Sequence, residues 1–115
     1  MHIADSNALD WAPAERSHYL TDVQEKLLWE DKKTGAKAAL IKFPVGIADK
    51  RHYHDANQQI YGMSGEFESP DGQKIPVAGL YGYFQKGEIH GQTNITKESI
   101  FLFIWDGSAE PIIAD

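Results

Sequence analysis

The sequence predicts an all-β fold, with the strands arranged as a sandwich or a barrel. Apolar and aromatic residues occur in short alternating runs, and clusters of turn-forming residues separate these runs. A helical period is almost absent from the chain. The chain has 115 residues, of which 42% are hydrophobic, and this suits one domain with a modest core. Because the connections are short, we expect neighbouring strands to run antiparallel.

The expected strands follow a weakly patterned N-terminal part. They are residues 26–30, 36–43, 58–68, 74–77, 80–84 and 99–105. Residues 31–35 form a polar turn, and residues 69–72 carry a strong hairpin signal of serine, proline, aspartate and glycine. We therefore expect residues 26–115 to form the β domain and residues 1–25 to pack on it as an N-terminal segment. His18, in that segment, is expected at the surface.

The composition argues against several classes of function. The formal net charge is −6 and no basic cluster is present, so a nucleic acid partner is not expected. The absence of cysteine rules out disulfides and thiolate ligands. No apolar run approaches the roughly 18 residues of a membrane span. The N-terminus has no signal-peptide pattern, so we expect a cytoplasmic protein, or a periplasmic one if a signal peptide has been removed.

Three of the five histidines fall in a spaced frame that predicts a metal site. Its two parts are Gly46-x5-His52-x-His54-x3-Gln58-x6-Gly65 and Gly79-x5-Gln85-x-Gly87-x2-His90-x3-Asn94. Residues i and i+2 of a strand point to the same side, so His52 and His54 can reach one ion. Together with His90 and the amide oxygen of Gln58, they suit one divalent transition metal: Fe(II), Mn(II), Ni(II), Co(II) or Zn(II). Gln58 either binds this ion directly or leaves three histidines to bind alone.

These two motifs resemble the paired motifs of the cupin superfamily over residues 26–107. The chain has Gln58 where the usual first motif has glutamate, and Gln85 where the second has proline. The flanking sequence is similar to a narrower group, the small single-domain ChrR-like cupins, which acetylacetone-dioxygenase-like proteins also resemble. The resemblance implies a small cupin-type jelly-roll β-barrel. It also implies a homodimer, which would protect the exposed strand edges of a small barrel.

A second group of residues is expected around the ion. Gln92 lies two residues after His90, so strand parity predicts that it faces the ion as a catalytic residue. The predicted substrate pocket is an apolar cavity, with simple core packing as the alternative use of its side chains. Its predicted wall consists of Ile41, Phe43, Ile60, Phe101, Phe103 and Trp105.

The resemblance implies a metal-dependent enzyme that acts on a small, enolisable or anionic organic substrate. The leading reaction is the oxygen-dependent cleavage of a dicarbonyl C–C bond by a dioxygenase, and this favours Fe(II). Without redox chemistry, the same site could serve a lyase or an isomerase as a Lewis acid. The alternative is a ChrR-like module that senses a metal or ligand without catalysis. Because Gln58 is uncharged, a bound ion would keep its full charge and favour an anionic ligand.

Overall fold

The structure is a computed structural model that describes residues 1–114, and within these residues every regular element except one 3-10 turn is a β-strand. The turn is η1 (Ser6–Ala8). The strands are β1 (Ala12–Pro13), β2 (Gln24–Glu30), β3 (Lys37–Phe43), β4 (Gly46–Ile47), β5 (His52–His54), β6 (Gln58–Glu68), β7 (Lys74–Pro76), β8 (Tyr81–Phe84), β9 (Asn94–Trp105) and β10 (Pro111–Ile113). The predicted all-β fold is confirmed. Among the described residues, no helix has the length and hydrophobicity that a membrane span requires.

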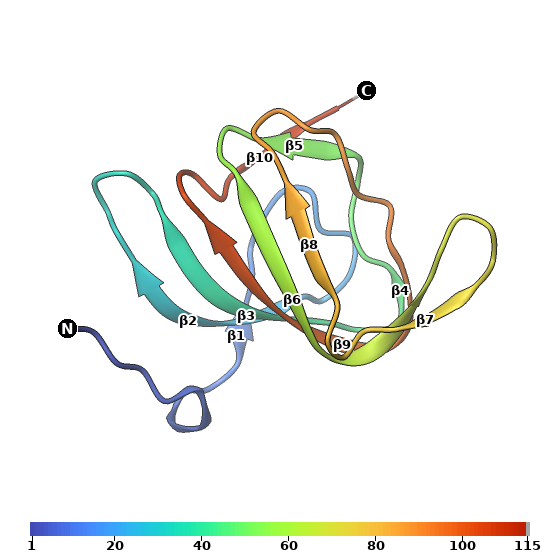
Figure 1. The fold of residues 1–115 in the computed structure, drawn as a ribbon, viewed down its shortest axis with the longest axis horizontal. Helices are drawn as coiled ribbons and strands as arrows, with labels where there is room; N and C mark the ends of the chain where they lie inside the picture. The colour runs from blue at the N-terminus through green and yellow to red at the C-terminus, as the bar shows by residue number, and fades with distance from the viewer. Residues whose placement is uncertain (115) are drawn as a thin grey trace.

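The strands form a small antiparallel jelly-roll barrel. The large sheet has the order β1-β2-β3-β9-β6-β7, with β4 paired to β9 and β8 paired to β6. A second sheet pairs β10 with β5. In Figure 1 the large sheet curls around the lower part of the molecule, and β5 and β10 lie across its upper end. An isolated antiparallel bridge between His52 and His90 ties β5 to the segment before β9.

Most predicted strands correspond closely to observed ones. The long strand β6 has the predicted bounds, and the prediction at 99–105 covers the second part of β9. The first part of β9 pairs with β4, where Gly46 faces Ile95, and with the far end of β6. A glycine is required in β6 because the Cβ of any larger residue at position 65 would collide with Ser99 of β9.

The hydrophobic core lies on the inner face of the sheet, where β3 and β9 are paired. Alternate residues of β3 are buried, namely Ala39, Ile41 and Phe43. Ile41 is paired with Phe101 on the neighbouring strand β9, and Trp105 at the end of β9 is 1% exposed. The alternation predicted for these strands therefore produces the inner surface of the barrel.

The N-terminal part reaches the same interior along a different path. Residues 16–20, which we call the N-terminal strap, run beside residues 48–50. The backbone N–H of Leu20 donates to the oxygen of Ala48 (2.9 Å), and that of Lys50 donates to the oxygen of His18 (2.8 Å). This path places the His18 side chain inside the barrel with 2% exposure, so the expectation of a surface position was wrong. A surface position was expected for His18 because the segment has no strand pattern. The backbone pairing with residues 48–50 instead directs its ring into the barrel.

Candidate metal centre

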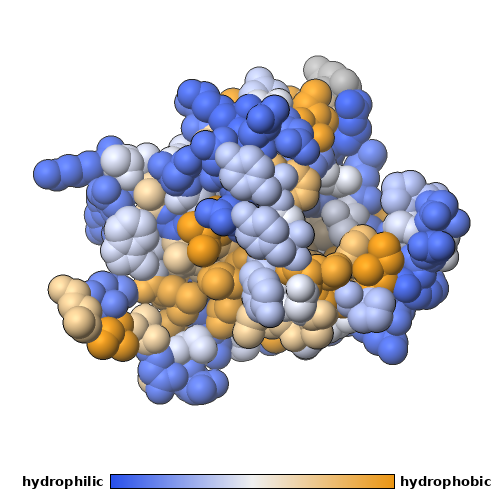
Figure 2. Space-filling model, in the orientation of Figure 1, coloured by the Kyte–Doolittle hydropathy of each residue, from blue (hydrophilic) through white to orange (hydrophobic). Residues whose placement is uncertain are grey.

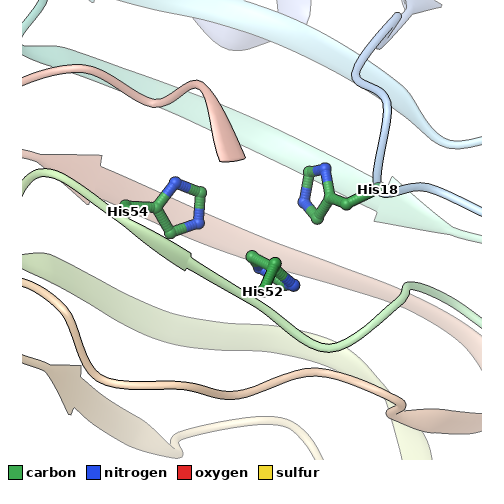
Figure 3. Close-up of side chains that lie close together, drawn as sticks. All are labelled: His18, His52 and His54. Atoms are coloured by element: carbon green, nitrogen blue, oxygen red, sulfur yellow. The ribbon is translucent and has the colours of Figure 1, made fainter. Parts of the chain in front are cut away.

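Three buried histidines form a group that could hold a metal ion. The candidate ligand atoms of His18, His52 and His54 all lie within 4.8 Å of one another. Each side chain is 2–3% exposed. His52 and His54 share one face of β5, as their spacing predicts, whereas His18 comes from the strap. Figure 3 shows the three rings arranged around a common space, approached from these two separate segments.

His90, the histidine of the second motif, lies next to this group. Its ring centroid is 4.3 Å from that of His52 and 5.5 Å from that of His54. Two backbone hydrogen bonds of 2.9 Å between His52 and His90 fix this arrangement. The structure therefore brings together the three histidines predicted from the motifs and adds His18 to them.

Backbone carbonyls set the protonation of two of the rings. His52 donates from Nδ1 to the oxygen of Lys50 (2.6 Å), and His90 donates from Nδ1 to the oxygen of Glu88 (3.0 Å). Because a carbonyl oxygen only accepts, each Nδ1 carries the proton and each Nε2 offers a lone pair. Hydrogen bonds of this kind fix the tautomer and orientation of metal-binding histidines.

Gly91 makes room for one of these hydrogen bonds. A Cβ at position 91 would come within 3.0 Å of the His52 Nδ1 atom and would collide with the oxygen of Lys50. The backbone φ of Gly91 is +120°, a conformation that larger residues rarely adopt. The glycine after His90 is thus part of the support for His52.

Burial keeps the four imidazoles in the neutral form that binds metals. Desolvation, together with the neighbouring histidines, lowers the pKa of His18 to about 2 and that of His54 to about 4. Desolvation also lowers the pKa of His52 and of His90, although their backbone hydrogen bonds act in the opposite direction. Neutral imidazole is the ligand form of histidine, so these rings need no deprotonation near neutral pH.

Unpartnered nitrogen atoms provide a test of whether the site fits an ion. The Nδ1 atom of His18 and the Nε2 atom of His90 are buried and have no hydrogen-bond partner among the described residues. A buried polar atom without a partner costs about 1–3 kcal/mol. A divalent transition ion would accept nitrogen lone pairs of this kind, and borderline metals prefer imidazole ligands. The donor set therefore fits such an ion.

Gln58 has a protein partner for its oxygen. Its side chain is 3% exposed at the start of β6, and Oε1 accepts a hydrogen bond of 2.8 Å from Nε1 of Trp105. The two residues face each other across the β6–β9 pair. Direct binding of the ion by Gln58 stays a prediction, and its observed role is to hold the indole ring of Trp105.

The histidines border an apolar cavity of about 300 Å³. Of the predicted wall residues, five line this cavity: Phe43, Ile60, Phe101, Phe103 and Trp105. Ile41 does not line it and is completely buried in the core. Ile41 shares a strand face with Phe43, so its position on the inner side of the barrel could be predicted. Its distance along the strand from the cavity could not.

Sequence reasoning missed several aromatic wall residues, and two of them contact the histidines. Tyr19 of the strap lines the cavity, and its ring centroid is 4.1 Å from that of His18. Phe84 also lines it and stacks on His90 at 4.4 Å. The aromatic run of β8 was a usable signal for Phe84. Nothing in the local pattern around Tyr19 indicated an interior position.

Gln92 lies away from the cavity, which corrects the expectation that it faces the ion beside His90. It borders a second hollow together with Arg51, and this hollow shares only Asp49 with the cavity. Strand parity applies only to extended backbone, and here φ is +120° at Gly91 and +59° at Gln92. The backbone N–H of Gln92 donates to the oxygen of Asp49 instead (3.1 Å). This placement does not support the predicted catalytic role.

Comparison with known sequence families now identifies the chain's relatives. Residues 1–110 match the family described as the ChrR cupin-like domain. The chain belongs to the ChrR cupin-like family. The predicted resemblance to cupins of this group is thereby confirmed, and the match includes the strap as well as both histidine motifs. A search of curated proteins found no significant match.

Several solved structures share the fold of this chain. A candidate acetylacetone dioxygenase of Methylibium petroleiphilum is 18% identical with a TM-score of 0.79, over 100% of this chain and 81% of that one. The acetylacetone dioxygenase of Acinetobacter johnsonii is 22% identical with a TM-score of 0.67, over 91% and 71%. The polyketide cyclase RemF of Streptomyces resistomycificus is 13% identical with a TM-score of 0.73, over 100% and 86%. At these identities the likeness establishes the fold, and the reaction has to be argued from the site.

Proposed function

We propose that this ChrR-like cupin is a metal-dependent dioxygenase that cleaves a C–C bond of a small, enolisable dicarbonyl compound. The observation that carries the proposal is the cluster of neutral, buried histidines at the edge of an apolar cavity. The volume, about 300 Å³, matches a small organic molecule. The acetylacetone dioxygenase activity named for a structural neighbour supports the choice of reaction.

The metal would be held by the histidine cluster, with His52, His54 and His90 as the motif ligands. Fe(II), the favoured ion, supplies both Lewis acidity and the electrons for oxygen chemistry when it is bound. Neither the histidines nor Gln58 contributes a negative charge. The site therefore favours a substrate that presents an anionic oxygen, such as the enolate of a dicarbonyl compound.

The remaining cavity residues have their own tasks in this proposal. The rings of Phe43, Phe101 and Phe103 exclude water and take the apolar substituents of the substrate. Because the oxygen of Gln58 is engaged by Trp105, its amide N–H groups are left to donate to a substrate oxygen. The Trp105 hydrogen bond thus orients the polar end of the pocket.

Oxygen consumption tests the proposal. The metal-free protein is reconstituted with Fe(II), or with Zn(II) as a redox-inactive control, and supplied with acetylacetone and a panel of larger β-dicarbonyls. We expect oxygen uptake, with matching loss of substrate, only in the Fe(II) protein. Substrate loss without oxygen uptake in the Zn(II) protein would favour a lyase or isomerase instead. Tight metal binding with no turnover of any compound would favour the sensing module instead.

We also propose that the protein is a homodimer. Exposed aromatic rings lie on β6 and β8, where Tyr61, Tyr81 and Tyr83 are 46%, 61% and 52% exposed. Figure 2 shows apolar side chains reaching the surface in a band across this face. A patch of this kind is a common feature of subunit contacts. Light scattering at micromolar concentration should give twice the chain mass of 12.9 kDa, and Tyr83→Lys should lower this value. A wild-type mass of 12.9 kDa would contradict the proposal.

A further inference from the structure

His18 is held against the metal-site histidines although it belongs to neither sequence motif. Its ring centroid is 4.2 Å from that of His52 and 6.0 Å from that of His54. The backbone oxygen of His18 accepts from Lys50, two residues before His52 in the chain. At the start of the strap, Arg16 forms a salt bridge of 2.9 Å with Glu25 of β2. The strap is therefore fixed at both sides of His18.

The surroundings of His18 do not explain the ring as a structural residue. Its Nδ1 atom is buried and has no hydrogen-bond partner among residues 1–114. The cationic side chain of Arg16 and three other imidazoles lie close enough to act on it electrostatically. A purely apolar ring would fill the same space without leaving a polar atom unpaired. An electron-pair acceptor among the imidazoles would instead satisfy that atom.

We infer that His18 is a ligand of the same metal ion as His52 and His54, so that the N-terminal strap closes the metal centre. This inference rests on the metal site of the proposed function. The ligand atoms of the three residues already lie within 4.8 Å of one another. The Gln58 oxygen, in contrast, is engaged by Trp105. The ion is then bound by neutral nitrogen ligands and joins the strap to β5.

The inferred ligand also links metal binding to the shape of the cavity. Tyr19, the next residue of the strap, lines the cavity, and its ring packs against Phe43 at 5.8 Å. An ion bound to His18 therefore fixes Tyr19 in the wall. In the metal-free protein, the strap keeps its backbone hydrogen bonds and the Arg16–Glu25 salt bridge but loses this additional connection.

Metal titration of matched variants tests the inference. Co(II) is titrated into wild type, His18→Ala, His18→Phe and His2→Ala. His18→Phe retains a ring against Tyr19 and lacks the nitrogen atoms, and His2→Ala removes an exposed histidine outside the site. We expect both His18 variants to bind Co(II) at least about 10- to 100-fold more weakly. Removing a residue that only hydrogen-bonds to a metal ligand already causes a loss of this size. His2→Ala should match wild type.

Two further measurements separate a ligand from a packing residue. X-ray absorption of the Co(II) protein should count one imidazole fewer in His18→Phe than in wild type. Bound metal should slow tryptic cleavage after Arg16 in wild type, and this protection should be lost in His18→Phe. Unchanged affinity in both His18 variants, while His52→Ala loses the metal, would overturn the inference and leave the metal site intact. An unchanged imidazole count in His18→Phe would also overturn it. If wild type binds no ion at all, both this inference and the proposed function are wrong.

Discussion

His52→Ala is expected to abolish stoichiometric metal binding. The His52 ring is adjacent to all three other imidazoles of the cluster, at centroid distances of 4.2 Å from His18, 5.0 Å from His54 and 4.3 Å from His90. Removing it takes away one ligand and the ring that is adjacent to the other three. We expect affinity for Fe(II) or Zn(II) to fall by about 100-fold or more. This is the upper end of the loss seen when a residue that hydrogen-bonds to a metal ligand is removed. Elemental analysis should then find less than one ion per chain after dialysis.

The control for this experiment is another histidine of the same chain. His2 is exposed, and its Nε2 atom lies 2.7 Å from the backbone oxygen of Leu28, outside the cluster. His2→Ala should retain the metal content and affinity of wild type. If His52→Ala retains full metal content by mass spectrometry as well, the ion is bound elsewhere and the site described here is not the metal centre.

Gln58→Glu is expected to strengthen metal binding and to weaken the binding of an anionic ligand. The substitution changes almost no volume, and a carboxylate oxygen can still accept the hydrogen bond from Trp105. It adds one negative charge at a buried position beside the cavity, where charges interact strongly. We expect metal affinity to rise, and affinity for a β-diketonate to fall, by about one to two factors of ten. Each factor of ten corresponds to about 1.4 kcal/mol.

The neighbouring residue supplies a matched control. Gln59 is on the same strand but points to the outer face, where its oxygen accepts from the hydroxyl of Tyr81 (2.8 Å). Gln59→Glu adds the same charge at an exposed position and should change neither affinity. Both variants are reconstituted with the same ion, and diketonate binding is followed by difference absorbance. Equal diketonate affinities in Gln58→Glu and Gln59→Glu, at equal metal occupancy, would argue against an anionic substrate.

The parts of the site that follow local rules could be predicted from the sequence. The i, i+2 spacing placed His52 and His54 on one face of β5, and the hydrophobic alternation placed Phe101, Phe103 and Trp105 along the cavity. Strands β4 and β10 escaped prediction because they are too short to show a period and, unlike β7, have no hairpin signal beside them. Their existence depends on the partners β9 and β5.

The parts that depend on distant contacts could not be predicted. His18 reaches the cluster only because the strap pairs with residues 48–50, and no local pattern of the strap indicates that pairing. Gln92 left the predicted face because two successive residues have positive φ, although Gly91 offered a warning that the strand is interrupted. The Gln58–Trp105 hydrogen bond depends on the register between β6 and β9, which the sequence does not reveal.

The walls of the cavity and its histidines belong to different strands. Phe101, Phe103 and Trp105 come from alternate positions of β9, whereas His52 and His54 come from β5, which pairs with β10 rather than with β9. Phe101 and Phe103 can therefore be exchanged for larger or smaller apolar residues over evolutionary time without altering the backbone that carries the histidines. Related chains could in this way bind different molecules while they keep the same histidine site. Trp105 would vary most slowly of the three because it donates a hydrogen bond to Gln58.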